Sequence, residues 1–475
     1  MNRNNHHHQK RKKEKEIEEQ EQQVNDGDDE IEEESITTEI SVVSNKEALS
    51  AFLQNKPKEF IDFLVDNNIP QDSYDINLDD LPRFIRLNNR LILEDGHHQD
   101  GHHDTKQQTV KQIEQELKTP LKELAWLPNF YQLKSTVGIS SSPSYKKGIM
   151  YGMDASSGAA ILALDPQPGD NVLDICCAPG TKFCMIADLI KGQGSVTGVD
   201  ISPSRLGSCK TVIKKYKIPK ARLFQCDATT FNIKAPSSLD PLPHLSDTNV
   251  KKRLKKKQKN DKEQDKENVN GEGEEEEEKE LENTTTTTNI EKKRKSKKNT
   301  KKIKYDLPDL YFSTDYFMRY SNSLYYDRVI VDAECSLDAS IRHLIQYSKI
   351  GRNFIPSELT ELTNLQKKLL QTGFNLLKEG GVLVYSTCSF CKAENEDVVT
   401  WLLENNPNSQ LEPCFGDTDR DTESDGDGQS NQNITVVPFS RGYIKHTYRF
   451  YPKNGTSGMF IARIVKMKST TTTTN

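Results

Sequence analysis

The stretch VLDICCAPGTK (172–182) decides the fold. It begins with the short apolar segment VLDI, passes through a Pro-Gly turn, and enters a segment with helical spacing of its apolar residues. A strand, a tight turn and a helix in this order bring main-chain N–H groups and the positive end of the helix toward a ligand. The spacing matches neither the phosphate loop G-x-x-x-x-G-K-[ST] nor the dinucleotide motif G-x-G-x-x-G. We therefore expect a ligand site here of another kind.

Four more short apolar segments follow, and helical patterns lie among them. The apolar segments lie at 195–200, 221–227, 327–332 and 380–387. The helical patterns lie at 155–163, 181–191, 204–217, 336–349, 358–378 and 394–405. This alternation predicts an α/β fold with a parallel sheet and helices on both faces. Two β-rich segments, 443–452 and 458–466, predict an antiparallel hairpin at the edge of the sheet.

The segment upstream of residue 150 has a mixed pattern. Residues 46–68 predict two short helices separated by Pro57, and residues 82–93 alternate as a strand does. The polar stretch 95–105 contains four His, which we interpret as surface residues of a loop rather than as metal ligands. Residues 108–125 predict an amphipathic helix. Together these elements indicate a small α+β subdomain.

Low-complexity tracts separate the folded parts. Residues 1–45 are polar and charged, and residues 235–304 hold KKRLKKKQK, EGEEEEEKELE and TTTTT, so neither tract is expected to form a core. We predict a disordered tail at 1–45, a subdomain at 46–148 and a main domain at 149–469. The main domain carries the disordered insertion 235–304, and a disordered tail follows at 470–475.

Composition and charge narrow the class of protein. Of the 475 residues 33% are hydrophobic, and no apolar run reaches the ~18 residues that a membrane helix needs. Residues 14–34 carry a net charge of −11, and leaving them out turns the overall −6 into +5, a balance that allows nucleic acid. The beginning of the chain has no secretory pattern, and the odd number of nine cysteines predicts reduced thiols. We expect an intracellular protein, in the nucleus or the cytoplasm with the nucleus preferred, that acts as a monomer.

Acidic residues end the second and third strands. Ligands of such folds bind outside the carboxyl ends of the strands. Asp200 follows Gly180 by 20 residues, where a carboxylate accepts hydrogen bonds from ribose hydroxyls. Asp227, at the end of the next strand, is placed to accept from an adenine amino group. Either Asp alone is equally a helix cap, but acidic strand ends around an Ala-Pro-Gly turn favour a nucleoside cofactor.

Two cysteines stand just beyond the fourth and fifth strands. Cys335 lies in DAECS and Cys388 in YSTCS. Adjacent strands lie ~5 Å apart, so both thiols are expected to reach one pocket. A lone Cys is usually a small buried hydrophobe, whereas two at adjacent strand ends favour catalysis. The spacing Cys388-x-x-Cys391 also occurs in zinc sites, but a second pair is required and is missing, so we expect no metal.

A reaction on a pyrimidine ring explains the use of two thiols. Carbon-5 of cytosine is too weak a nucleophile to take a methyl group by itself. Addition of a thiolate to carbon-6 makes carbon-5 nucleophilic, and loss of the carbon-5 proton and of the thiolate ends the cycle. Covalent catalysis thereby replaces one difficult step with easier ones.

These motifs in combination resemble the Nol/Nop/Sun family of S-adenosylmethionine-dependent RNA cytosine carbon-5 methyltransferases. The likeness rests on ICCAPGTK, DAECS, YSTCS and ENED (394–397), and covers about 150–234 and 305–465. A weaker likeness joins PRFIRLN (82–88), WLPNFYQL (126–133) and YGMDASSG (151–158) to that family's RNA-binding subdomain and entry motif. The resemblance implies a Rossmann-like methyltransferase sheet, S-adenosyl-L-methionine as cofactor and RNA as partner, with tRNA preferred over rRNA.

The resemblance also implies a role for individual residues. Cys388 would be the nucleophile, Cys335 would assist product release, and Asp332 would face the cytosine near the cofactor. The implied cofactor-binding residues are Cys176, Cys177, Ala178, Pro179, Gly180, Thr181, Lys182, Asp200, Arg205, Asp227 and Asp332.

Two positions depart from the family pattern. Thr181 stands where the family has Gly, and Glu334 stands where the family has the Pro whose carbonyl helps to hold the base. Glu334 keeps open an alternative function, a cofactor-binding and RNA-binding protein without turnover. Because a scaffold needs neither Cys335 nor Cys388, the sequence favours the active enzyme.

Overall fold

The structure is a computed structural model of the chain. It describes residues 54, 56, 58–74, 81–95, 102–237, 309–314, 322–341, 356–415 and 437–468. By its internal contacts the chain divides into residues 1–238 with 308–475, and residues 239–307, and every described residue belongs to the first unit. The predicted tails at 1–45 and 470–475, and the predicted insertion from residue 238 onward, lie outside the described residues.

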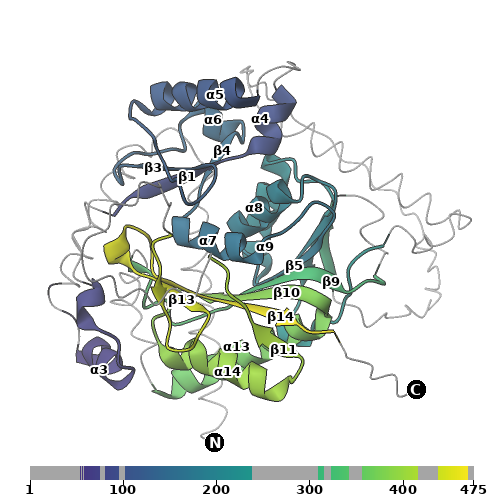
Figure 1. Cartoon of the computed structure of the whole chain (residues 1–475). Helices are drawn as coiled ribbons and strands as arrows, with labels where there is room; N and C mark the ends of the chain where they lie inside the picture. Colours follow the sequence, from purple (N-terminus) through teal and green to yellow (C-terminus); the bar gives the residue numbers. More distant parts are fainter. Residues whose placement is uncertain are drawn as a thin grey trace, which may run out of the picture. The chain divides into compact units, whose positions relative to one another are not determined.

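The main sheet has ten strands, and its five central strands run parallel (Figure 1). These are β5 (Asn171–Ile175), β6 (Ser195–Asp200), β7 (Ala221–Gln225), β9 (Tyr326–Asp332) and β10 (Leu377–Thr387), in the order β10-β9-β5-β6-β7. They are the five strands that the apolar segments predict, so the Rossmann-like α/β fold is confirmed. The strand order reverses between β5 and β9, which is where ligands bind in folds of this type.

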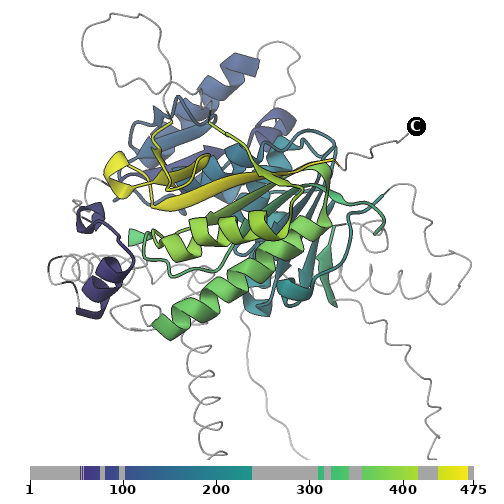
Figure 2. The ribbon, with the colours of Figure 1, turned by 60° about the horizontal axis from the view of Figure 1, so that its bottom comes forward.

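Helices cover both faces of this sheet. One face carries α7 (Ala155–Leu164), α8 (Thr181–Leu189) and α9 (Pro203–Lys215), and the other carries α13 (Pro356–Leu376) and α14 (Glu396–Asn405). Figure 2 shows α13 and α14 side by side across their face. Neighbouring residues of one strand serve opposite faces, as Val172 and Leu173 do in β5. The strands carry apolar residues at adjacent positions because both of their faces are buried.

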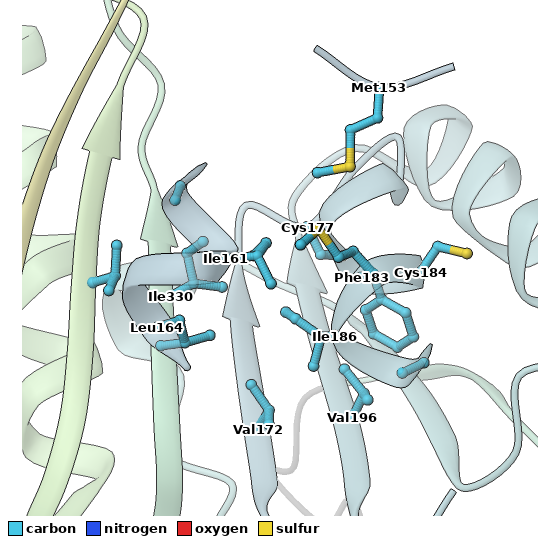
Figure 3. Packing of buried hydrophobic residues seen from close by; sticks show 14 of the residues in the cluster. Met153, Ile161, Leu164, Val172, Cys177, Phe183, Cys184, Ile186, Val196 and Ile330 are labelled. Carbon is cyan, nitrogen blue, oxygen red and sulfur yellow. The ribbon is translucent and has the colours of Figure 1, made fainter. Parts of the chain in front are cut away.

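The core on the α7–α8 side is built from small and branched side chains. Figure 3 shows Ile161 of α7, Ile186 of α8 and Val172 of β5 within this cluster. Gly158 of α7 lets the upstream subdomain approach, because a Cβ there would lie 2.5 Å from the Phe130 ring. The small residues of 155–163 therefore serve close packing on both sides of the helix.

Antiparallel strands extend the sheet at both ends. β13 (Thr447–Phe450) and β14 (Met459–Lys466) form the predicted hairpin, and β14 pairs with β10. Sequence reasoning missed β12 (Ser440–Arg441), β11 (Ser409–Leu411) and β8 (Asp309–Ser313), which pair with β13, β14 and β7. Ala235 also forms a bridge with Leu324, so the first residues of the predicted insertion still belong with the sheet.

The upstream subdomain holds a second, four-stranded sheet in the order β2-β3-β1-β4. Its strands are β1 (Arg83–Leu87), β2 (Lys122–Glu123), β3 (Phe130–Leu133) and β4 (Met150–Gly152), and all pairs are antiparallel. Its helices are α4 (Asn89–Asp95), α5 (His102–Leu117) and α6 (Pro143–Lys146). Before it come α3 (Lys58–Asp66) and the 3-10 turn η1 (Gln71–Tyr74); short 3-10 turns η2 (Ala228–Thr230), η4 (Lys392–Glu394) and η5 (Pro452–Asn454) occur farther along. Within the described ranges no helix has the length and apolar character needed to cross a membrane.

Three element predictions are wrong in their bounds. The strand predicted at 82–93 ends at Leu87, because Leu91 and Ile92 are adjacent and both buried, which suits the helix α4. The helix predicted at 108–125 runs instead from His102 to Leu117, so two of the expected loop His begin it. It ends before Pro120 because proline removes a helix N–H and clashes with the preceding turn.

The third wrong prediction is the helix at 336–349. Residues 333–340 form an irregular loop instead, and most of the remaining positions lie outside the described residues. Of the two short helices predicted at 46–68, α3 is the second, and the first lies mostly outside the described part of the chain.

Candidate active site

The predicted cofactor loop joins β5 to α8 in a tight, irregular turn. Cys176 and Gly180 have positive φ values of 63° and 107°, and the Ala178–Pro179 bond is cis. The N–H of Cys177 donates to the carbonyl of Val199 on β6, which fixes the loop against the neighbouring strand. Thr181 begins α8, whose first N–H groups have no partner within the helix. The loop therefore presents a helix N-terminus at the carboxyl edge of the sheet.

Asp200 ties the end of β6 to this loop. Its side chain is buried, its Oδ1 accepts from the N–H of Ser202 at 3.0 Å, and its Oδ2 accepts from the N–H of Ala178 at 3.3 Å. Arg205 on α9 lies 3.7 Å from Oδ2 and donates to the carbonyl of Ala178 at 2.8 Å. Asp200 thus caps the loop. Because each carboxylate oxygen can accept more than one hydrogen bond, Asp200 can also accept one from a ribose hydroxyl.

Asp227 stands at the end of β7 and caps η2. Its Oδ1 accepts from the N–H and the hydroxyl of Thr229, at 2.8 and 2.7 Å. The residue is exposed, in contrast with Asp200. The structure therefore places it at the same sheet edge but at the open side of the site.

Asp332 and Lys182 form an ion pair across the loop. The Nζ of Lys182, in the first turn of α8, lies 2.8 Å from Oδ2 of Asp332 at the end of β9. Ser386 on β10 donates to the other oxygen, Oδ1, at 2.7 Å. Burial would lower the pKa of Lys182, but the charge of Asp332 and its hydrogen bond raise it overall. Lys182 therefore stays protonated and holds Asp332 in a fixed orientation.

The two predicted catalytic thiols meet. The Sγ atoms of Cys335 and Cys388 are 3.3 Å apart, on the loops that follow β9 and β10. The N–H of Ala339 donates to the carbonyl of Cys388 at 3.1 Å, which joins the two loops directly. Cys335 is buried and Cys388 is half-buried. The hydrogen bond that Cys335 makes to Cys388, together with burial, raises the pKa of Cys335 well above its usual value, so Cys335 holds its proton.

Glu334, which stands where the family has Pro, lies directly before Cys335. Its side chain is exposed, whereas the main-chain carbonyl of Glu334 accepts from Nε2 of Gln366 on α13 at 2.8 Å. A carbonyl oxygen has two lone pairs, so this bond leaves it able to accept one more.

The other cysteines lie apart from this pair. Cys391 is buried and directs its thiol to Oδ1 of Asn67 at 3.0 Å, and Cys177 faces Cys209 with their sulfurs 3.9 Å apart. Cys176 is half-buried on the cofactor loop. Within the described residues, no group of three or more His, Cys, Asp or Glu side chains is placed to hold a metal ion.

A comparison with protein families now identifies the chain. The family model described as 16S rRNA methyltransferase RsmB/F matches residues 161–241 and 276–465, which is more than half of the chain. The chain belongs to this family. The resemblance to Nol/Nop/Sun methyltransferases drawn from the sequence is thereby confirmed.

Curated relatives of this RsmB/F chain are methyltransferases of RNA. Mouse tRNA (cytosine(72)-C(5))-methyltransferase NSUN6 is 25% identical over 323 residues, which cover 67% of this chain and 48% of the mouse protein. A tRNA (cytosine(49)-C(5))-methyltransferase of Pyrococcus abyssi is 34% identical over 158 residues, or 32% of this chain and 44% of that protein. The chain spans about half the length of the curated relatives that it matches.

Solved structures share the fold. NSun6 from Pyrococcus horikoshii, crystallised with SFG, has a TM-score of 0.52 at 15% identity, over 87% of this chain and 99% of that one. A methyltransferase homologue from the same organism has a TM-score of 0.50 at 20% identity, over 89% and 99%. At these identities the likeness supports the fold alone.

Sequence reasoning missed one buried acid of the RsmB/F site. Asp174 lies within the strand β5, is 1% exposed, and its Oδ2 has no hydrogen-bond partner among the described residues. Burial, then the charge of Asp332, raises its pKa well above the usual value. The signal was available, because an ionisable residue inside an apolar strand is costly unless it is used.

The polar groups around the loop fit S-adenosylmethionine. The orphaned buried oxygen of Asp174 lies beside the carboxylates of Asp200 and Asp332, whose charges add to burial in raising its pKa, and a cationic group nearby would favour its ionised, accepting form. A cluster of acids with an unused acceptor suits a ligand that carries cationic groups, and this cofactor has an ammonium and a sulfonium group. Asp200, Asp332 and the loop residues Cys176–Lys182 are the residues that would hold it.

Proposed function

We propose that this protein methylates carbon-5 of cytosine in RNA, with S-adenosyl-L-methionine as the methyl donor, through a covalent adduct with Cys388. The observation that carries the proposal is the 3.3 Å distance between the thiols of Cys335 and Cys388 at the ends of adjacent strands. A methyltransferase without covalent catalysis has no use for two thiols in contact at this place. Membership of the RsmB/F family supports the same reaction.

The chain's own residues account for the steps on the base. Addition forms a bond between Sγ of Cys388 and carbon-6, and moves the electron pair of the 5,6 double bond to carbon-5. When bound, the cofactor supplies the electrophilic methyl group that carbon-5 receives. A water molecule then takes the carbon-5 proton, the electron pair returns to the 5,6 double bond, and the bond from carbon-6 to sulfur breaks, so that Cys388 leaves as a thiolate. Lys182 and Ser386 hold the carboxylate of Asp332 in one orientation. In that orientation Asp332 would face the cytosine and lie near the cofactor.

Cys335 assists the last step from its position beside Cys388. Because its pKa is raised, Cys335 keeps a proton that it can donate to the departing sulfur 3.3 Å away. A donor at that distance stabilises the negative charge that develops on Cys388 as it leaves the base. The alternative without turnover gains no support from the geometry, because Glu334 still presents a main-chain carbonyl and both thiols are in place.

We propose tRNA as the preferred substrate, because curated relatives are named as tRNA cytosine methyltransferases. The subdomain predicted at 46–148 would bind the RNA as the upstream likeness implies. We also propose a monomer that resides inside the cell, with the nucleus preferred because Lys/Arg runs occur at 251–257 and 292–298. Imaging of the tagged chain with and without these runs tests the nuclear part.

The decisive experiment uses the order of addition and release. Cys335→Ala should still add to carbon-6 and accept the methyl group, but release it slowly, so that a protein–RNA adduct survives a denaturing gel. Cys388→Ala, and the double variant, should form no adduct and transfer no labelled methyl group. Turnover by Cys388→Ala would refute the nucleophile, and an adduct with Cys388→Ala but none with Cys335→Ala would exchange the two roles. Bisulfite sequencing of RNA from a deletion strain then locates the cytosine.

A further inference from the structure

Each catalytic thiol is followed in the sequence by a serine, and the two serines meet beneath the thiols. Ser336 and Ser389 are fully buried, and their hydroxyl oxygens are 3.1 Å apart. Both hydroxyls also contact one carboxyl oxygen, Oε1 of Glu394, at 2.5 and 2.8 Å. Glu394, the first residue of the ENED motif, is itself fully buried in η4. One carboxyl group therefore joins the loop of Cys335 to the loop of Cys388.

The other oxygen of Glu394 holds the backbone on both sides of Cys335. Its Oε2 accepts from the N–H of Ser336 and from Nε2 of Gln366, each at 2.9 Å. The same Nε2 of Gln366 donates to the carbonyl of Glu334 at 2.8 Å. Through these bonds Glu394 controls residues 334 and 336, and hence the direction of the thiol between them.

A second buried carboxyl group faces the first across Ser336. Oδ1 of Asp338 lies 2.7 Å from the hydroxyl of Ser336, and Asp338 accepts from the N–H of Phe390 at 3.0 Å and from the hydroxyl of Tyr74 at 3.2 Å. Among the described residues neither Glu394 nor Asp338 takes part in a salt bridge. Two acids thus share one hydroxyl in a site closed to water.

Counting protons shows that this arrangement is one proton short if both acids are ionised. The hydroxyl of Ser336 has a single hydrogen, yet it lies within hydrogen-bond distance of a carboxyl oxygen of Glu394 and of one of Asp338. Only one of these contacts can use that hydrogen, and the hydrogen of Ser389 is used toward Glu394. The remaining contact, between two oxygens at 2.5 or 2.7 Å, requires a proton on one of the acids.

Several groups that can titrate or donate face Glu394 from the elements packed against it. Asp338 and Cys335 come from the loop after β9, Tyr385 from β10, Cys391 from the loop before η4, Gln366 from α13, and Tyr74 reaches Asp338 from η1. Burial, and next the charge of Asp338, raises the pKa of Glu394 to about 7. Burial also raises the pKa of Asp338. The retained proton is therefore lost near neutral pH.

We propose that Glu394 is a positioning residue that holds the two thiol-bearing loops together through one retained proton. Loss of this proton leaves two buried negative charges around a single hydroxyl, and the loops move apart. The thiols of Cys335 and Cys388 then lose their spacing, and methylation slows. The expected effect on the methylation rate rests on the proposed function. The expected effect on the spacing of the two thiols is independent of it.

The test compares Glu394→Gln with the wild type over pH 6 to 9. An amide at this position accepts the two N–H bonds through its oxygen and donates to both serine hydroxyls through its NH₂, with Ser389 turned from donor to acceptor, so it supplies the missing hydrogen without titrating. Glu404→Gln, on the exposed side of α14, is the control for the loss of one charge. Glu394→Ala removes the network, and if it fails to fold, Glu394→Gln alone decides.

Two measurements are made on each full-length variant. Phenylarsine oxide bridges thiols in contact, and peptide mass analysis at saturation reports the bridged fraction of Cys335 with Cys388. Single-turnover transfer of labelled methyl to RNA reports the rate. The pH dependence that comes from ionisation of Cys388 affects both proteins alike. It therefore cancels when the rate of Glu394→Gln is divided by the wild-type rate. That ratio should rise about fivefold between pH 7 and pH 8, as expected for one group of pKa about 7.

The bridged fraction should fall above pH 7 in the wild type and in Glu404→Gln, stay constant in Glu394→Gln, and be low at every pH in Glu394→Ala. A constant rate ratio together with equal bridging in all variants would overturn the proposal. If bridging follows the expectation but the wild type transfers no methyl group to RNA, the proposed function fails and the positioning by Glu394 stands. If the wild type methylates RNA but bridging is insensitive to Glu394, only the positioning fails.

Discussion

A buried ion pair between the two sheets allows a quantitative prediction. Arg86 on β1 belongs to the four-stranded sheet, and Asp188 on α8 packs on the main sheet. Nη2 of Arg86 lies 2.5 Å from Oδ2 of Asp188, and the side chains are 1% and 4% exposed. Arg86 also donates to the hydroxyl of Tyr151 at 2.8 Å, and the N–H of Arg90 donates to Asp188 at 3.1 Å.

Removing one partner leaves the other charge buried without compensation. Asp188→Asn keeps the shape and removes the charge, and we expect it to lower the free energy of unfolding by about 3–5 kcal/mol. Burial would lower the pKa of Arg86, but Tyr151 and Asp188 raise it overall, so the guanidinium stays charged in the folded protein. Its Nε has no hydrogen-bond partner among the described residues, so the pair is imperfectly satisfied.

Replacing both partners should therefore cost much less than the two single changes suggest. In Arg86→Met with Asp188→Leu, no charge remains to be desolvated, and we expect an unfolding free energy within about 2 kcal/mol of the wild type. Urea titrations of the wild type, Arg86→Met, Asp188→Leu and the double variant, followed by fluorescence and circular dichroism, give the four values of the double-mutant cycle. A cost below about 1 kcal/mol for Asp188→Asn, or a double variant as unstable as the sum of the single changes, would refute this reasoning.

Three further predictions concern the site and the insertion. Asp200→Ala should weaken cofactor binding by about 1.5–3 kcal/mol per charged hydrogen bond lost, and an unchanged affinity in calorimetry would make Asp200 a loop cap only. The pKa of Glu394 is raised from 4.5 to about 7 in the folded protein. Its protonated form therefore stabilises the fold fully below pH 4.5, and this contribution is lost as the pH rises to 7. Unfolding titrations should show the wild type losing roughly 3 kcal/mol relative to Glu394→Gln over that range, and parallel curves would contradict it. Deleting 240–304 should leave methylation of a short RNA nearly intact, and a variant that fails to fold would contradict the predicted insertion.

The parallel core was predictable because burial on both faces leaves a local signature. Segments such as 172–175 and 327–332 carry apolar residues at adjacent positions, Val172 with Leu173 and 329–331, which neither an amphipathic helix nor a half-exposed strand requires. The carboxyl ends of parallel strands lie at one edge of the sheet. The order of the segments therefore predicts that Asp200, Cys335 and Cys388 lie at that edge. The contact of the two thiols followed from the adjacency of β9 and β10.

The upstream subdomain was less predictable because its signals conflict. In 82–93 an alternating start runs into the adjacent apolar pair Leu91 and Ile92, and only the buried position of both shows the change to a helix. The short strand β2, with both residues exposed, has no pattern of its own and exists through its pairing with β3. Pro120 was a usable signal for the end of α5.

The residues that hold the two thiol-bearing loops in place could not be found from local sequence patterns, because their partners are distant in the sequence. Tyr74 donates to Asp338 across 264 positions, and Asn67 accepts from Cys391 across 324. Phe60, Phe63 and Leu64 pack in one cluster with Phe390, so α3 and η1 lie against the two thiol-bearing loops. The segment upstream of the four-stranded sheet therefore helps to position the two thiol-bearing loops, and a boundary drawn only from strand and helix patterns separates it from the loops that it supports.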